Sequence, residues 1–156
     1  MTIWPPPERI AIDHDDYHAK HIGHTSDGRQ FFLTTPFRPG FGGDAGEEFV
    51  ALYLFDPDGQ LLEARIDTFG PRGTMDLAAR TATYEQRLRE LGDVTYDRIE
   101  IAPFTVERFG TAFGLIPRDD EDDEDDEDGD IDWYVELHPG NYMAFAPPWD
   151  SGEYDT

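Results

Sequence analysis

The sequence predicts an α+β fold, in which a mainly antiparallel sheet of about eight strands carries one amphipathic helix packed on one face. Three observations lead to this class. An apolar segment and an alternating segment are joined by a turn near the middle of the chain, a single later segment has helical periodicity, and short strand patterns stand on both sides of it. Strands grouped before and after one helix are typical of α+β proteins and not of alternating α/β sheets.

The central hairpin is the strongest of these patterns. Every residue from Phe49 to Phe55 is apolar, which indicates a strand covered on both of its faces. The sequence Asp56-Pro57-Asp58-Gly59 then favours a tight turn, because proline presets φ for the second position and glycine tolerates positive φ. The next strand alternates, and Leu62, Ala64 and Ile66 are expected to share its covered face.

One helix is predicted, over about residues 74–91. Its apolar stripe recurs at helical spacing and should press on the sheet, and it consists of Leu77, Thr81, Tyr84, Leu88 and Leu91. Thr74 is expected to cap the first turn, since a side-chain oxygen there accepts a hydrogen bond from an unpaired backbone N–H. Gly92 is expected to end the helix, because glycine adopts the left-handed conformation common after a last turn.

Shorter strand patterns account for the remainder of the fold. They are Ile10–Ile12, Phe31–Thr35, Ile99–Ile101, a hairpin of Thr105–Phe109 and Ala112–Ile116 closed around Gly110 and Thr111, Trp133–Leu137 and Tyr142–Phe145. We expect a single domain over residues 1–156 in which residues 146–156 form an extended C-terminal tail.

The charge of the chain is strongly negative. Asp and Glu number 35 against 12 Lys and Arg, which gives a net charge of −23, and without the acidic run the chain still carries about −12. Residues 118–130 are predicted to form a disordered acidic loop, because clustered like charges repel each other and cannot be buried. The strands on either side of this loop are expected to pair or to be neighbours. The acidic side chains of the run, which are the candidate partner-binding residues, are Asp119, Asp120, Glu121, Asp122, Asp123, Glu124, Asp125, Asp126, Glu127, Asp128 and Asp130.

The composition excludes several kinds of chemistry. The chain has no cysteine, so it forms no disulfide, thiolate metal site or thiol nucleophile. It contains no phosphate-binding loop and no G-x-S-x-G nucleophile motif. No signal peptide or membrane-spanning segment is visible, so we predict a cytoplasmic protein without a membrane partner. An excess of carboxylates repels phosphates, so direct binding to nucleic acid is not expected.

Two segments resemble metal sites in part. On a helix, His14, His18 and His21 would share one face, but the glycines and the turn after His24 favour a hairpin, in which the imidazoles separate. The acidic run matches part of a calcium-binding loop, yet its twelfth position is Val135 where a bidentate Glu is needed. We therefore predict no specific metal or cofactor, and expect divalent cations to screen the run only loosely.

Four segments resemble a family of small acidic bacterial proteins often labelled formate hydrogenlyase regulatory proteins. They are Leu52–Ile66, Ile99–Val106, Phe113–Pro117 and the ending PPWD…YDT. These motifs are hairpins, strands that end at proline, and a tail. The resemblance therefore implies a single domain over most of the chain and carries no catalytic residues with it.

Three hypotheses for the function follow. The preferred one is a non-enzymatic interaction or regulatory protein that docks on a basic protein, in the manner of an immunity protein or a nucleic-acid mimic. The second is an enzyme with a carboxylate-based site that one sequence does not identify. The third is a salt-adapted domain whose acidity has no specific partner.

Overall fold

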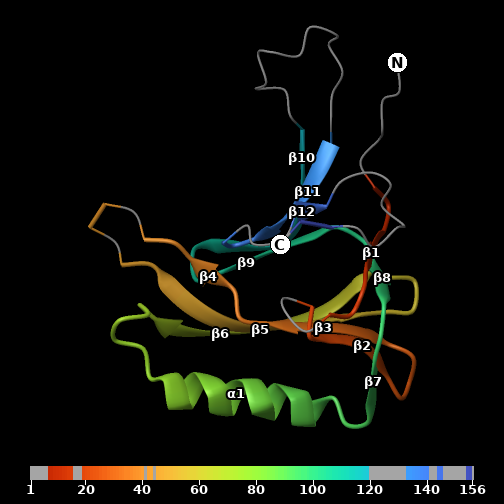
Figure 1. The fold of residues 1–156 in the computed structure, drawn as a ribbon, viewed down its shortest axis with the longest axis horizontal. Coiled ribbons are helices and arrows are strands. Elements are labelled where there is room, and N and C mark those ends of the chain that lie inside the picture. Colours follow the sequence, from red (N-terminus) through yellow and green to blue (C-terminus); the bar gives the residue numbers. More distant parts are fainter. Residues whose placement is uncertain are drawn as a thin grey trace, which may run out of the picture.

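The computed structural model describes residues 7–15, 19–40, 42–43, 45–119, 133–140, 144–145 and 154–155 of the 156-residue chain. These residues form mainly antiparallel sheets with one helix, in agreement with the predicted class. Figure 1 shows three layers, with the five-stranded sheet on one side of the six-stranded sheet and α1 on the other. Among the described residues, no helix has the length and apolar character needed to cross a membrane.

The six-stranded sheet forms the middle layer. It contains β2 (His21–Thr25), β3 (Gln30–Thr34), β4 (Phe37–Arg38), β5 (Glu47–Phe55), β6 (Leu61–Gly70) and β7 (Val94–Tyr96). The five-stranded sheet contains β9 (Phe104–Arg108), β10 (Thr111–Asp119), β11 (Trp133–His138), β12 (Ala144–Phe145) and β13 (Tyr154–Asp155). A separate pair joins β1 (Ile10–Ile12) to β8 (Ile99–Ile101). The prediction of about eight strands is too low, because it does not include the short strands β4, β7 and β13, which have two or three residues each.

Strand β5 is the centre of the fold, as its continuous apolar sequence predicted. It pairs with β3 and β4 along one edge and with β6 along the other. Phe49, Ala51, Tyr53 and Phe55 belong to the core cluster shared with the five-stranded sheet, which includes Phe113, Leu115, Val135 and Leu137. Val50, Leu52 and Leu54 belong instead to a second cluster on the helix side of the sheet. Alternate residues of one strand therefore supply two separate cores.

The β5–β6 turn has the predicted geometry, but the start of β6 does not. Gly59 has φ +90° and donates to the Asp56 carbonyl at 2.9 Å, which closes the turn. A register shift next to Phe55 places Leu61 opposite it, and Leu62 is 56% exposed. The prediction that Leu62 faces the core is therefore wrong, because a bulge inserts one residue and reverses the facing at that point. Leu61 packs against the core in its place, together with Ala64 and Ile66.

Helix α1 (Leu77–Glu90) begins three residues later than predicted. Asp76 is the N-cap, since its backbone is extended and its carboxylate accepts a hydrogen bond from the Ala79 N–H of the first turn at 3.1 Å. Thr74 belongs to the preceding turn, where its hydroxyl donates to the Pro71 carbonyl at 3.4 Å. Gly92 ends the helix as predicted, with φ +74° and a hydrogen bond to the Arg89 carbonyl at 3.1 Å.

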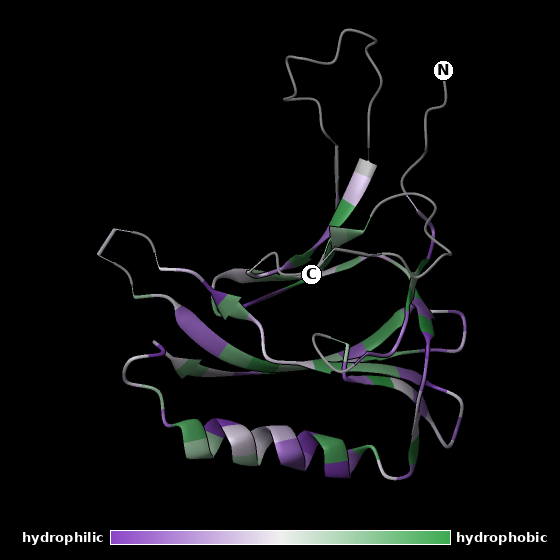
Figure 2. Ribbon diagram, viewed as in Figure 1, coloured by the Kyte–Doolittle hydropathy of each residue, from purple (hydrophilic) through white to green (hydrophobic). Residues whose placement is uncertain are grey.

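The helix is mostly polar, and Figure 2 shows hydrophilic residues along much of its length. No residue within it is fully buried. Tyr84 and Leu88 are partly buried against the second core cluster, to which Leu91 belongs. Leu77, the first member of the predicted stripe, is 57% exposed. The stripe therefore contacts the sheet only through its second half.

The β9–β10 hairpin turns one residue earlier than predicted. Thr111 pairs with Arg108, so Phe109 and Gly110 form the turn. Both have positive φ, +54° and +70°, as a two-residue hairpin loop with the twist of its strands requires.

Strands β10 and β11 pair from Gly114 opposite His138 to Asp119 opposite Trp133. This pairing confirms the prediction that the strands flanking the acidic run are neighbours. Residues 120–132, which connect the two paired ends, lie outside the described residues, as do most of residues 146–156. The predicted start of the loop at residue 118 is wrong, because Arg118 and Asp119 extend β10 and pair with Tyr134 and Trp133. Within the predicted tail, the structure describes only β13, which pairs with β12.

Candidate functional site

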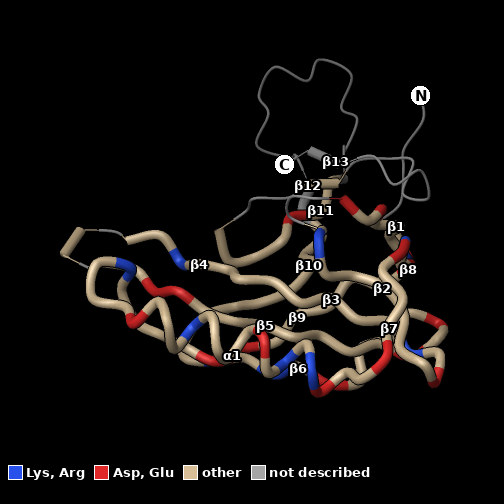
Figure 3. Tube along the Cα trace, turned by 60° about the horizontal axis from the view of Figure 1, so that its bottom comes forward, with Lys and Arg blue, Asp and Glu red and all other residues tan. Residues whose placement is uncertain are grey.

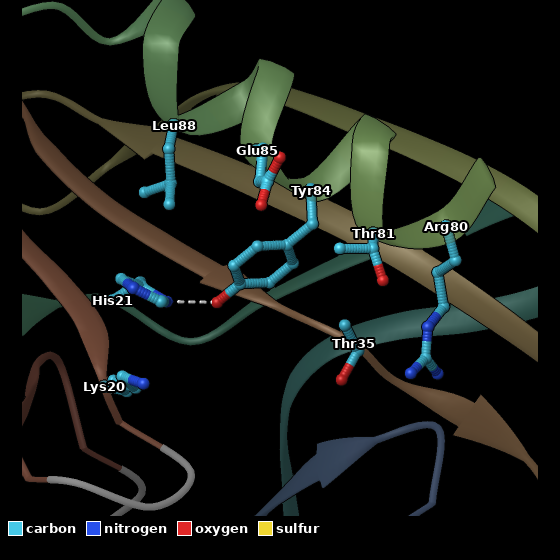
Figure 4. Close-up of a pocket in the computed structure, with 8 residues that line it drawn as sticks. All are labelled: Lys20, His21, Thr35, Arg80, Thr81, Tyr84, Glu85 and Leu88. Atoms are coloured by element: carbon cyan, nitrogen blue, oxygen red, sulfur yellow. Dashed lines mark hydrogen bonds between the residues drawn. The ribbon is translucent and has the colours of Figure 1, made fainter. Parts of the chain in front are cut away.

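A cavity of about 430 Å³ lies between α1 and the neighbouring end of the six-stranded sheet. Figure 4 shows how its walls are arranged. Arg80, Thr81 and Thr35 stand at one end, and Lys20 and His21 stand at the other. The ring of Tyr84 lies between the two ends. Leu88 and Glu85 complete the wall on the helix side.

The side chains of His21 and Tyr84 join the sheet to the helix across this cavity. The His21 Nδ1 and the Tyr84 hydroxyl are hydrogen-bonded, and their rings meet edge to face with centroids 5.2 Å apart. Burial, followed by the neighbouring charges of Lys20 and His14, lowers the pKa of His21. Burial also raises the pKa of Tyr84 above its ordinary value of 10. The pair is therefore neutral at pH 7, with an uncharged imidazole and a protonated phenol.

Arg80 reaches the cavity from an ion cluster built around one buried carboxylate. The carboxylate of Glu48, which is only 4% exposed, accepts from Arg72 through Oε1 and from Arg80 Nη1 through Oε2 at 3.4 Å. Two guanidinium groups thus share one carboxylate, so the cluster carries a net charge of +1. Arginine has five N–H donors, and the long contact to Glu48 occupies one of those of Arg80. The rest of this guanidinium can bind a further acceptor.

Lys20 supplies the second cation of the cavity and is the only lysine of the chain. Its side chain is exposed, and its ammonium group has no ion pair within the described part of the chain. The backbone carbonyl of Lys20 accepts a hydrogen bond from His14 Nε2 at 2.8 Å. This contact involves only the backbone of Lys20, so it does not occupy the ammonium group.

The histidines of the segment that resembles a metal site in part have separate partners. His21 contacts Tyr84, and His24 Nδ1 lies 2.6 Å from Asp97 Oδ1. The ring of His14 stacks near Tyr96, with centroids 5.9 Å apart, and His18 lies outside the described residues. The predicted hairpin is correct, since β2 pairs with β3 over His21–His24. Among the described residues, no group of three or more His, Asp or Glu side chains could hold a metal ion.

A second feature is an acidic surface at the end of the molecule where four segments meet: the β2–β3 turn, the β5–β6 turn, the residue that follows β1, and residues 97–100, which lead into β8. Gln30 connects two of these segments, because its Nε2 donates to the carbonyls of Asp56 and Glu100 at 3.2 and 2.9 Å. Figure 3 shows acidic residues near β7 and β8, with basic residues among them. We call this surface the acidic turn end, and define it by Asp13, Asp27, Asp56, Asp58, Asp97 and Glu100.

The cations at the acidic turn end are bound to its own carboxylates. Arg98 Nη1 lies 3.1 Å from Asp13, and Arg29 Nε lies 3.0 Å from Asp27. Six carboxylates against these two guanidiniums leave a net charge of −4. Hydrogen bonds from Thr25 and then from Arg29 lower the pKa of Asp27, so this carboxylate stays charged at moderately acidic pH.

The same internal pairing occurs between the helix and β6. Arg87 contacts Asp67 and Glu90, each at 2.9 Å, and Arg65 contacts Glu90 at 2.6 Å. Burial alone would raise the pKa of Glu90, but hydrogen bonds from Arg87 and Arg65 outweigh it and lower the pKa. Most arginines whose side chains are described thus neutralise acids of the same chain, and they do not form an external basic surface.

The predicted partner-binding run is placed only by its ends. Asp119 is the last residue of β10, and Asp120 to Asp130 lie outside the described residues. Sequence reasoning did not find the acidic turn end, because its carboxylates come from four separate segments. It assigned Tyr84 and Thr81 only to a packing stripe and did not single out Arg80 or Thr35 as cavity residues. The spacing of Arg80, Tyr84 and Leu88 on one helix face was the available signal.

No family model matches the chain, and no curated protein or solved structure is significantly similar to it. The resemblance to the family labelled formate hydrogenlyase regulatory proteins therefore stays a prediction. The candidate sites rest on the geometry of this chain alone.

Proposed function

We propose that this protein is a non-enzymatic interaction protein that docks on a basic protein partner through its acidic surface. The observation that carries the proposal is the acidic turn end. Separate segments of the fold bring six carboxylates to one end of the molecule, while the arginines among them are already paired. A basic partner would meet a negative field with few free cations of this chain to oppose it.

The charge outside the turn end adds to the same field. The chain carries −23 in total, and the acidic run from Asp119 to Asp130 contributes eleven of its carboxylates. Complementary fields of this kind accelerate encounter between partners and make association sensitive to salt. They also disfavour a nucleic acid partner, whose phosphates carry the same sign.

A defined partner and two matched variants test the proposal. Proteins captured from the native cell extract at physiological salt are identified, and their binding to the purified chain is then measured by biolayer interferometry. The first variant combines Asp56→Asn, Asp58→Asn and Glu100→Gln at the acidic turn end. The control removes three exposed acids elsewhere, through Glu8→Gln, Glu63→Gln and Glu107→Gln.

We expect a basic partner whose association rate falls several-fold in the turn-end variant, falls less in the control, and decreases steeply with added salt. The dissociation rate should change less than the association rate, since most of these charges are exposed. A captured protein that binds both variants equally and ignores salt would refute the proposal. Failure to capture any basic protein would favour the third hypothesis, in which the acidity is a general adaptation to salt.

A further inference from the structure

We propose that the cavity between α1 and the six-stranded sheet binds a small organic monocarboxylate, whose carboxylate is held by Arg80, Thr35 and Thr81. This site shares no residue with the acidic turn end, so the proposal does not depend on the proposed function. Its basis is that two cationic side chains and two hydroxyl groups line one cavity, in a chain that has only 12 cations in total; Glu85 is the one acidic residue among those that line it.

The Arg80 end of the cavity has the donors that a carboxylate needs. The Arg80 side chain is 23% exposed and is oriented from the helix toward Thr35, while the Thr81 hydroxyl lies beside it on the same wall. Guanidinium groups form paired hydrogen bonds with carboxylates, and hydroxyl groups can donate to the remaining lone pairs. The contact of Arg80 with Glu48 is long, at 3.4 Å, and involves one Nη atom, which leaves the other N–H donors of this guanidinium for a ligand.

The rest of the cavity fits the body of such a ligand. The ring of Tyr84 lies along the middle of the space, and Leu88 adds apolar surface beyond it. A volume of about 430 Å³ accommodates a compact aromatic or branched acid. Lys20, at the far end, adds positive potential and can receive a polar substituent of the ligand.

The charge of the whole chain favours a monoanion over a dianion. Each added negative charge on the ligand meets the repulsion of the distant acids, although salt screens these over about 8 Å. Arg80 and Lys20 line the cavity itself, and so does Glu85, whose carboxylate repels a second negative charge on a ligand. The acidic turn end is formed by other segments of the fold. A ligand with one carboxylate is therefore attracted by Arg80 and Lys20 and is repelled less by the acids of the chain than a dianion would be.

Titration followed by amide NMR tests the proposal with three probes on the full chain. Benzoate represents the proposed class of ligand, benzamide is its neutral isostere, and inorganic phosphate represents a different class of anion. We expect benzoate to shift the amide signals of Thr35, Thr81 and Tyr84 in a saturable manner, with benzamide and phosphate at least about tenfold weaker. Equal binding of benzoate and benzamide, tighter binding of phosphate, or shifts confined to other residues would each overturn the proposal.

Variants separate the role of the cavity from that of the overall charge. Arg80→Gln should weaken benzoate about tenfold or more, since it removes a charge-assisted pair of hydrogen bonds. Arg29→Gln removes the same charge from the β2–β3 turn and should leave benzoate affinity unchanged. Should Arg80→Gln fail to fold, Thr81→Val serves in its place, because it keeps every charge and removes one hydroxyl donor. Unchanged benzoate affinity in Thr81→Val and in a folded Arg80→Gln would refute the site.

Discussion

Replacement of residues 120–132 by Gly-Ser-Gly-Ser should stabilise the protein. These thirteen residues connect Asp119 of β10 to Trp133 of β11, which lie opposite each other in the antiparallel pair, so a short connection can span them. Loop-closure entropy scales with (3/2)RT ln n, and shortening thirteen residues to four lowers the closure penalty by about 1 kcal/mol. In a chain of this length, about 1 kcal/mol raises the melting temperature by roughly 2–4 °C.

The repulsion among the removed acids contributes little to this change. Neighbouring carboxylates of the run remain neighbours in the unfolded chain, so most of their mutual repulsion is present in both states and cancels. Only the repulsion between the run and the rest of the fold remains, and it is screened over about 8 Å at physiological salt. A control variant with a thirteen-residue Gly/Ser linker isolates this part, because it removes the charges at constant length.

Urea denaturation measures the free energy of unfolding of both variants. We expect the short linker to exceed the long linker by about 1 kcal/mol, with similar m-values, and the long linker to lie within about 0.5 kcal/mol of the original chain. A short-linker variant that loses cooperative unfolding, or is less stable than the original chain, would refute the reasoning. That result would show that residues 120–132 make contacts on which the fold depends.

Two further predictions concern single residues. Gly114→Ala should destabilise the protein by about 3 kcal/mol or more, because Gly114 has φ +142° and an added Cβ would lie 2.0 Å from the Phe104 carbonyl oxygen. Gly73→Ala is the control, because no atom lies within 4 Å of an added Cβ there, and it should change stability by about 0.5 kcal/mol or less. Comparable urea midpoints for the two variants would contradict this. His21 has a lowered pKa, caused first by burial, so the unfolded chain binds more protons than the folded chain as the pH falls below about 6.5. The contribution of neutral His21 to stability is therefore complete above that pH and is lost as the pH falls through the lowered pKa. His21→Gln should reduce the slope of stability between about pH 7 and pH 5, and an unchanged slope would exclude His21 as its source.

The central hairpin could be predicted because its information is local. The apolar sequence of β5 requires cover on both faces, and the structure covers it with the five-stranded sheet on one face and the second core cluster on the other. The turn at Asp56–Gly59 follows from the φ preferences of proline and glycine. Neither feature depends on which distant segment supplies the cover.

The errors in the elements occurred where two local signals competed. Thr74 and Asp76 are both good caps, and the hydrogen bond of Thr74 to the Pro71 carbonyl leaves Asp76 to begin the helix. Leu62 fits a strict alternation, but the bulge beside Phe55 turns it outward. Because a bulge depends on the partner strand, alternation within one strand could not reveal it.

The sequence by itself determined the α+β class, the central hairpin, the single helix, the strands on either side of the acidic run and the large negative charge. Each of these follows from the period of side chains along one segment, or from composition. Only the tertiary structure decided that six carboxylates from four separate segments share one end of the molecule. It alone placed Lys20, His21 and Thr35 opposite Arg80 and Tyr84 around one cavity. The physical reason is that such sites depend on strand register and on the docking of the helix, which involve residues far apart in the chain.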